Sequence, residues 1–114
     1  MASTRTIQDA ITQARTMLQD KAADRYTDAE LIEDFNNAIA ECKRLRPDLF
    51  VYKEALPYYS TSELSEDFPV TSIYFQAVVY FVVGNAELRD DEFAVDGRAM
   101  SLLTSFTAKL RGAA

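Results

Sequence analysis

The residues in this chain most able to do chemistry are a short run of carboxylates, Glu30, Glu33 and Asp34. Two carboxylates that converge in a pocket can act as a general acid and a general base, and clustered carboxylates can also bind a divalent cation. This run follows a helix-start motif directly, however, and charged residues in such a position usually form a solvated helix face. We therefore assign these residues no catalytic and no metal-binding role.

The thiol of Cys42 is the other candidate nucleophile. It is the only cysteine, and the chain contains no histidine. A single thiol excludes an internal disulfide, and without histidine the usual base of a catalytic triad and a common zinc ligand are both missing. Cys42 also falls on the apolar stripe of a predicted helix, so we expect it to be buried. The sequence predicts no enzyme, no cofactor and no metal site.

The acidic balance of the chain limits its partners. Eighteen acidic side chains against twelve basic ones give a net charge of −6, so the chain as a whole repels phosphate backbones and anionic membrane surfaces. The longest apolar run, 73–83, is interrupted by Gln76 and has about half the length that crosses a bilayer. The N-terminal segment lacks the apolar core of a signal peptide. We expect no membrane partner and no specific binding of nucleic acid.

A first amphipathic helix is predicted near 6–20. Thr6 is a candidate N-cap, with Asp9 at the third helical position. The apolar residues recur at the spacing of one helix face. They are Ile7, Ala10, Ile11, Ala14, Met17 and Leu18.

The second helix, near 28–45, has the clearest local signal. Thr27 and Glu30 form a capping box, in which each side chain can satisfy a free backbone N–H of the other. Pro47 ends the helix because it pushes the preceding residue out of the α conformation. One apolar stripe runs along the segment: Leu31, Ile32, Phe35, Ala38, Ile39, Cys42 and Leu45.

A segment with no helical period, about 47–69, follows the second helix. It mixes aromatic residues with Pro57 and the polar run 60–67. Segments of this length without a regular element are usually functional or pair into a short hairpin. The stretch Phe50-Val51-Tyr52 could supply one strand of such a hairpin. We call the segment 47–69 the arm.

Two further helices are predicted after the arm, near 71–89 and 93–110. The run 73–83 is apolar nearly all round and β-branched, so its pattern alone fits a buried strand as well as a buried helix. Its length favours a helix, and a helix with two apolar faces must lie at the centre of a bundle or against another subunit. Gly97 suggests either a close helix approach or a helix start nearer to Arg98.

These elements predict a mainly α fold for a single domain, 1–114. The expected architecture is bundle-like, with four helices and a long extended arm or short hairpin between the second and third. The apolar faces of these helices place several residues in the core. The ones we expect to be buried are Ala38, Ile39, Ala77, Phe81 and Phe106.

The order of short motifs resembles the small head-to-tail adaptor (connector, or head completion) proteins of tailed bacteriophages. That family typically ends its first helix in a Leu-Gln-Asp-like turn and its second in Arg-Pro. The matching pieces, which cover nearly the whole chain, are Leu18-Gln19-Asp20, Leu31, Asn37-Ala38, Arg46-Pro47-Asp48, Phe68-Pro69-Val70, Ala86, Asp90-Asp91-Glu92, Phe106 and Leu110. The chain departs from the family in having Gly97 in the last helix and no long C-terminal tail.

The resemblance implies a structural virion protein without catalytic activity. Such a protein is assembled in the host cytoplasm and forms a homo-oligomeric, twelvefold ring at the head-to-tail joint. Its partners are the portal protein on one side and the tail or nozzle protein on the other. The alternative is a small acidic helical binding or regulatory protein without catalytic activity, which would present Glu63, Glu66 and Asp67 to a basic partner.

The arm and the C-terminal turn supply the candidate interface residues. Aromatic side chains on a segment with no helix to bury them usually mark an interface, although they can also fold back over the domain's own core. At the C-terminal turn, a basic residue stands beside an apolar one, and by resemblance this turn meets the portal. The candidates are Phe50, Tyr52, Tyr58, Tyr59, Leu110 and Arg111.

Overall fold

Four α-helices make up most of the protein, seen here in a computed structural model that describes residues 5–23, 25–50, 58–89 and 96–112. They are α1 (Ile7–Leu18), α2 (Asp28–Leu45), α3 (Phe75–Arg89) and α4 (Asp96–Leu110). Three short 3₁₀ turns accompany them, at Pro47–Phe50, Thr61–Glu63 and Ser72–Tyr74. No strand occurs among the described residues, so the predicted mainly α, four-helix fold is confirmed.

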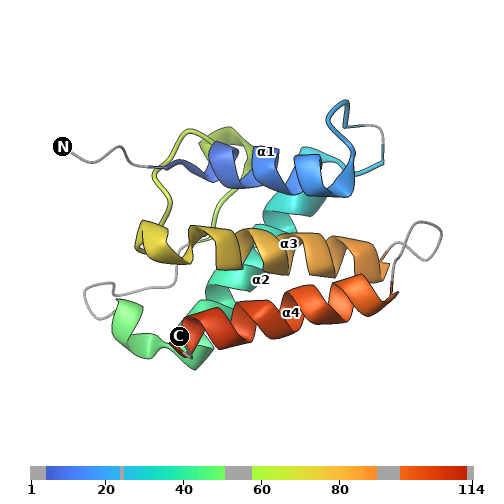
Figure 1. Ribbon diagram of the computed structural model, residues 1–114. Helices are drawn as coiled ribbons and strands as arrows, with labels where there is room; N and C mark the ends of the chain where they lie inside the picture. The colour runs from blue at the N-terminus through green and yellow to red at the C-terminus, as the bar shows by residue number, and fades with distance from the viewer. Residues whose placement is uncertain (1–4, 24, 51–57, 90–95, 113–114) are drawn as a thin grey trace.

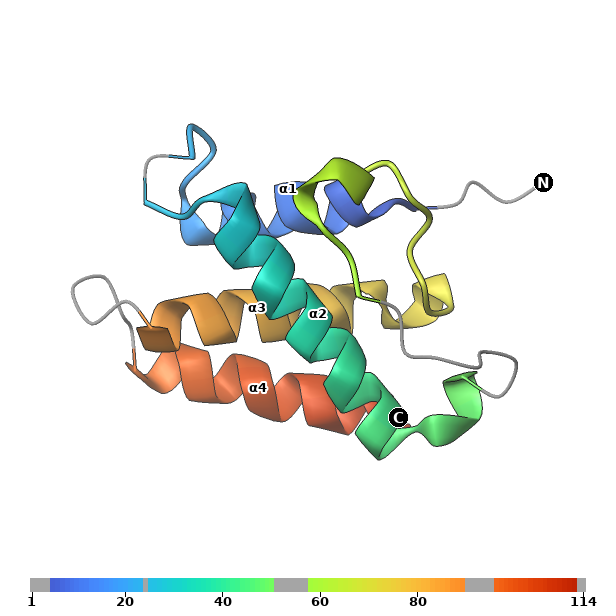
Figure 2. The same cartoon turned by 180° about the vertical axis from the view of Figure 1, so that it is seen from behind.

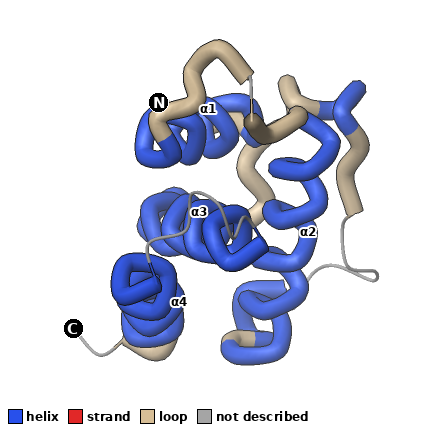
Figure 3. The backbone as a smooth tube through the Cα atoms, turned by 90° about the vertical axis from the view of Figure 1, so that its right-hand side faces the viewer, coloured by secondary structure: helices blue, strands red, loops and turns tan. Residues whose placement is uncertain are grey.

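Helix α3 lies at the centre of the arrangement. In Figures 1 and 2 it runs between α1 and α4, and α2 crosses this row of three helices along one side (Figure 3). Its buried residues point in every direction around the axis. The sequence therefore shows neither the period of 2 typical of a half-buried strand nor the period of 3.6 typical of an amphipathic helix. The prediction that the run 73–83 is helical is confirmed from Phe75 onward, although the helix starts four residues later than 71. None of the described helices is long and apolar enough to span a membrane.

Local capping sets the starts of α1 and α2, as their sequences predict. In α1, the Asp9 amide donates to Thr6 Oγ1 at 3.2 Å and the Thr6 amide donates to Asp9 Oδ2 at 3.0 Å. In α2, Thr27 and Glu30 form the same reciprocal pair, at 3.1 and 2.9 Å. Each pair satisfies backbone N–H groups that a helix start leaves without an intrahelical partner.

The connection between α1 and α2 is organised by Arg15 and Asp20, both more than nine-tenths buried. The Arg15 guanidinium pairs with Asp20 at 3.3 Å and with Asp28 at 2.6 Å, and it donates to the Tyr26 carbonyl at 2.8 Å. Asp20 in turn accepts the Tyr26 amide at 2.9 Å. The Leu-Gln-Asp turn of the sequence is therefore a joint that fixes the start of α2 relative to the end of α1.

The described part of the arm does not form a hairpin. Its first residues are the 3₁₀ turn Pro47–Phe50, and its last residues return to the start of α1 (Figure 1). There the amides of Ile7 and Gln8 donate to the carbonyls of Glu66 and Leu64, at 3.0 and 2.8 Å. The arm is thus part of the fold, because it satisfies free N–H groups in the first turn of α1. The proposed strand 50–52 is wrong at Phe50, which is 3₁₀, and otherwise lies outside the described residues.

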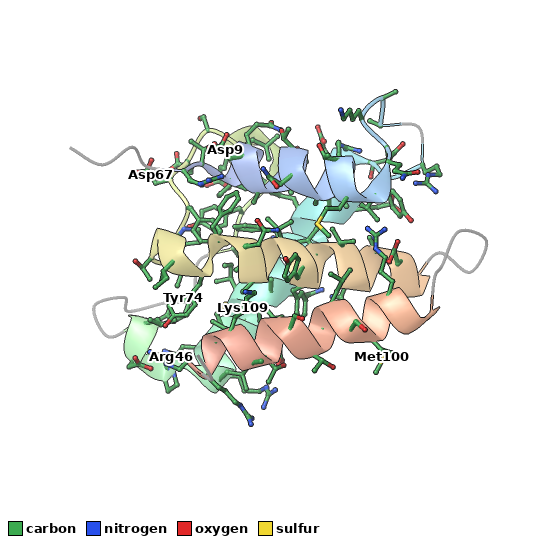
Figure 4. All side chains as sticks on the ribbon, in the orientation of Figure 1. Asp9, Arg46, Asp67, Tyr74, Met100 and Lys109 are labelled. Carbon is green, nitrogen blue, oxygen red and sulfur yellow. The ribbon has the colours of Figure 1, made fainter. Side chains whose placement is uncertain are left out.

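Arg46 joins three segments at the other end of the molecule. Its guanidinium donates to the Leu110 carbonyl at 2.6 Å and to the Tyr74 hydroxyl at 3.1 Å, and it forms a two-point pair with Asp48 at 2.8 and 2.9 Å. Figure 4 shows Arg46 and Tyr74 together at this end of the bundle. The Arg-Pro-Asp motif therefore caps the end of α4 and fixes it to the end of α2.

The last helix is described from Asp96 to Leu110, and the predicted start near 93 falls on residues outside the described part of the chain. Of the two explanations for Gly97, the close helix approach is wrong. A Cβ there would meet nothing within 4 Å, so no close helix approach requires it. The prediction that Phe81 is buried is wrong, because its ring lies at the edge of the α3–α4 contact, half-buried, 4.8 Å from the Phe106 ring. The other four predicted core residues are buried, namely Ala38, Ile39, Ala77 and Phe106.

Candidate protein interface

The three carboxylates of α2 do not converge on one site. Glu30 is engaged in the capping box and Glu33 accepts the hydroxyl of Tyr58 at 2.6 Å, and both side chains are exposed. Asp34 points the other way, into the protein, where it is 1% exposed and pairs with Arg89. Across the described residues, no group of three histidine, cysteine or acidic side chains is arranged to hold a metal ion.

Burial decides the chemistry of Asp34 and Cys42. The pKa of the Asp34 carboxyl is raised, because burial outweighs the lowering effect of Arg89, whose side chain is 44% exposed and therefore partly screened by water. One carboxylate oxygen of Asp34 has no hydrogen-bond partner. Burial raises the pKa of the Cys42 thiol to about 12, with a further contribution from Glu41. The thiol is therefore neutral at pH 7 and is not a nucleophile there.

Replacing Asp34 by asparagine should raise the free energy of unfolding at pH 7 by about 1 kcal/mol, because the amide removes an ionised group from a buried position. The raised pKa in the folded state means that Asp34 favours folding below its ordinary pKa of 3.8 and loses this contribution as the pH rises through the raised value. The gain should therefore vanish near pH 3.5, where the carboxyl is protonated in both states. Urea unfolding at both pH values measures this.

A matched control is Glu66→Gln, which removes an exposed carboxylate and should show no such pH dependence. If Asp34→Asn instead lowered the free energy of unfolding at pH 7 by more than about 2 kcal/mol, the pair with Arg89 would outweigh the desolvation of the carboxylate.

Two of the six predicted interface residues belong to the domain's own core. Phe50 is 2% exposed and Leu110 is 0% exposed, so neither side chain is available to a partner in this conformation. Both belong to the same buried cluster as the stripes of α1, α2 and α3. This corrects the prediction for both residues: the aromatic ring and the isobutyl group fill the core that the chain itself provides. Tyr52 lies outside the described residues.

Tyr59 is held against α2, so here the alternative that the arm folds back is the correct one. Its backbone amide donates to Asn36 Oδ1 and its carbonyl accepts from Asn36 Nδ2, both at 2.9 Å. Its ring packs edge-on against Phe35, with the centroids 6.1 Å apart. The Asn36 side chain, 4% exposed as a residue, thus pairs with the arm as a neighbouring strand would.

Tyr58, unlike Phe50 and Tyr59, is an aromatic residue of the arm that is exposed. It is 69% exposed, and its hydroxyl donates to Glu33 Oε1. Glu33 raises the pKa of this hydroxyl by accepting its hydrogen bond. The bond to Glu33 and the neighbouring Tyr59 anchor together hold the ring on the outer side of α2, so Tyr58 is a positioned aromatic side chain on the surface.

A shallow groove follows the outer face of α4 and contains the predicted residue Arg111. Its volume is about 480 Å³, and its lining is mainly apolar: Leu103, Thr104, Thr107, Ala108 and Arg111. Met100, one helical turn before the groove, is 59% exposed. Figure 4 shows Met100 on α4 at the rim of the molecule. We call these five lining residues the α4 groove.

A second, more polar pocket of about 330 Å³ lies where α1, α3 and α4 meet. Glu87, 5% exposed, lies in its wall and forms an ion pair with Arg98 at 3.5 Å. Arg98 also donates to the Met17 carbonyl at 2.6 Å. These contacts explain the pocket as a joint between the three helices, in which the arginine neutralises a buried carboxylate and completes the end of α1.

Sequence reasoning missed Asn36 and most of the α4 groove. For the groove a signal was present, because Met100, Thr104, Thr107 and Arg111 recur at helical spacing along one side of the buried stripe of α4. For Asn36 there was none, since its partner is 23 residues away in a segment without periodicity. Comparison of the chain with protein-family models, with curated proteins and with solved structures found no match.

Proposed function

We propose that this protein is a non-catalytic structural adaptor of a tailed-phage head-to-tail joint. It forms a homo-oligomeric ring between the portal protein and the tail or nozzle protein. The observation that carries the proposal is the presence of two separate exposed surfaces. Tyr58 stands beside α2, and the α4 groove lies on another helix. A protein that connects two neighbours needs at least two such surfaces.

The motif order of the family resemblance supports the proposal. Leu18-Gln19-Asp20 and Arg46-Pro47-Asp48 stand at joints between helices, where Asp20 and Arg46 each bind more than one segment. Motifs that fix helix ends relative to one another fit a protein whose task is to hold a shape. By the same resemblance, the exposed C-terminal turn with Lys109 and Arg111 meets the portal.

The alternative, a small acidic regulator, is supported by only two of its three proposed carboxylates. Glu66 and Asp67 are exposed, and Figure 4 shows Asp67 near Asp9 at the start of α1. Glu63 is half-buried and accepts the Ser60 amide at 2.9 Å, so it is engaged inside the arm. Such a regulator would bind a basic surface, and its binding would weaken steeply with salt.

The test of the adaptor is retention on purified portal protein. We expect the portal to retain this protein at about micromolar concentration in a buffer of moderate salt. Size-exclusion chromatography of the mixture would show the two proteins eluting together, earlier than either alone. An unrelated acidic helical protein of similar size is the control and should elute separately. A portal that retains none of this protein under these conditions would overturn the adaptor role.

A further inference from the structure

The side chain of Asn36 binds the arm only through the arm's backbone. The Tyr59 amide donates to Asn36 Oδ1, and Asn36 Nδ2 donates to the Tyr59 carbonyl, both at 2.9 Å. Every residue except proline offers this pair of backbone groups. An N–H and a C=O from one residue are also what a strand presents to its neighbour in a sheet. Asn36 is therefore built to hold an extended backbone rather than a particular side chain.

Two neighbouring side chains on α2 add selectivity for aromatic residues. The Phe35 ring packs edge-on against the Tyr59 ring, with the centroids 6.1 Å apart, and Glu33 accepts the Tyr58 hydroxyl at 2.6 Å. Glu33, Phe35 and Asn36 lie within one turn of α2, and Figure 2 shows the arm beside this helix. We call these three residues the α2 site. It fits an extended segment with two adjacent aromatic side chains, the first of which carries a hydroxyl.

The contacts of the α2 site with the arm are separate from those that fix the rest of the arm. Ser60 and Glu63 bond to each other within the arm. The described backbone bonds to α1 begin at Leu64, whose carbonyl accepts the Gln8 amide at 2.8 Å. The segment 58–59 can therefore leave α2 while the last part of the arm stays on α1.

A vacant α2 site favours a replacement ligand. When the arm leaves, the Phe35 ring loses its contact with the Tyr59 ring, and apolar surface is exposed to water. The Asn36 amide, which is 4% exposed with the arm in place, loses both of its bonds to the arm. A second extended segment that offers a backbone N–H, a backbone C=O and an aromatic ring would restore both contacts. The arm thus has the position of an internal ligand.

We propose that the α2 site is a peptide-binding site, which the chain's own arm occupies until an extended segment of a partner protein replaces it. The partner segment carries a tyrosine followed by a second aromatic residue, as the arm does at Tyr58 and Tyr59. The arm then regulates the site by competition. Such binding requires neither a ring nor the portal, so it goes beyond the adaptor function and does not rest on it.

The arm is a strong competitor because it is part of the same chain. A tethered ligand acts at an effective concentration of about millimolar or higher. The apparent affinity of a free peptide is lowered by the fraction of molecules in which the site is occupied by the arm. For the original protein we therefore expect a dissociation constant of about 10 mM or weaker for a short peptide.

The test first removes the arm from the α2 site. Tyr59→Pro takes away the N–H that Asn36 binds and the ring that packs on Phe35, but it leaves the site itself unchanged. The probe is a synthetic peptide with the sequence of residues 58–65, blocked at both ends. Binding is followed by the NMR signals of the α2 backbone amides. We expect a dissociation constant of about 1 mM for this variant, at least about tenfold below that of the original protein.

Two controls separate this contact from nonspecific apolar binding. The first is the same peptide with an N-methyl group on the backbone nitrogen at the Tyr59 position, which keeps every side chain but removes the donor to Asn36 Oδ1. It should bind at least about tenfold more weakly, because the buried amide oxygen is left without its partner. The second is Asn36→Ala in the Tyr59→Pro protein, which should lose binding of the unmodified peptide to a similar extent.

Tyr59→Ala is a milder variant that keeps the test valid if the proline variant does not fold. It retains the backbone amide and removes only the ring, so its affinity for the peptide should lie between those of the original protein and Tyr59→Pro. A Tyr59→Ala variant that is itself unfolded would overturn the proposal, because the arm would then be an essential part of the core rather than a replaceable ligand.

Three further results would overturn the proposal. They are a folded Tyr59→Pro variant that binds no peptide at about 5 mM, an N-methylated peptide that binds as tightly as the unmodified one, and an original protein that binds the peptide as tightly as the variant. The last result would show that the arm and the peptide do not share a site. Failure of portal retention, with the peptide binding as expected, would sink the adaptor role and leave the α2 site standing.

Discussion

Replacing Phe35 by alanine should lower the free energy of unfolding by about 3 to 5 kcal/mol, the range for deleting a fully buried aromatic ring. Phe35 is 0% exposed and lies between two parts of the arm, with ring centroids 6.1 Å from Tyr59 and 5.9 Å from Phe68. Phe68 continues to Phe75 at the start of α3, at 5.2 Å. The cavity would therefore loosen the arm and the α2–α3 contact together. Urea unfolding followed by circular dichroism measures the loss.

Phe35→Leu is the matched control for this prediction, because it keeps an apolar side chain of similar reach while removing the ring. Its loss should be smaller than that of alanine, since less of the volume is left empty. A loss below about 1 kcal/mol for the alanine variant would contradict the assignment, because it would show that Phe35 is not part of the close-packed core.

Replacing Gly84 by valine should lower the free energy of unfolding by about 1 to 3 kcal/mol through overpacking. A Cβ on Gly84 would lie 3.0 Å from Leu103 Cγ and 3.3 Å from the Ala99 carbonyl oxygen. The first contact can relax by moving a side chain, but the second is to backbone, so α4 would have to move away from α3. Thermal unfolding of the variant should show the loss, and the α4 groove should be distorted because Leu103 lines it.

Gly97→Ala is the matched comparison, because a Cβ there meets nothing within 4 Å. Alanine has the higher helix propensity and restricts the unfolded chain more, so the free energy of unfolding should rise by about 0.5 to 1 kcal/mol. The two glycines of the α3–α4 pair should therefore respond in opposite directions. Equal effects of the two substitutions would contradict the close approach of the helices at Gly84.

The sequence predicts the elements that depend on neighbouring residues. The capping boxes at Thr6 and Thr27 act over three positions, and the helix stripes act over one or two turns, so both can be recognised locally. For 73–83 the periodicity failed, because buried residues lie all round the helix axis, and only the length of the segment separated helix from strand. Four helices were predicted on this basis, and the structure has four α-helices in its described residues.

What could not be predicted depends on partners distant in sequence. Asn36 pairs with Tyr59, and Arg46 reaches Leu110, 64 positions along the chain. The close helix approach, which was one of two explanations for Gly97, occurs at Gly84 instead, because a glycine in an apolar run gives no local sign of the neighbouring helix. The prediction of the candidate interface residues failed in part for the same reason. Aromatic residues in the arm looked alike, and only their contacts separate Phe50 in the core from Tyr58 on the surface.

The pairing of Asn36 with Tyr59 also allows the arm to open locally while the rest of the domain stays folded. The Tyr59 amide is protected by a side-chain carbonyl rather than by a helix or a sheet. Rotation of one amide group breaks both of these hydrogen bonds to the arm, while α2 keeps its backbone bonds. Hydrogen exchange at Tyr59 therefore reports local release of the arm, separately from global unfolding, which the amides of the α2 core report.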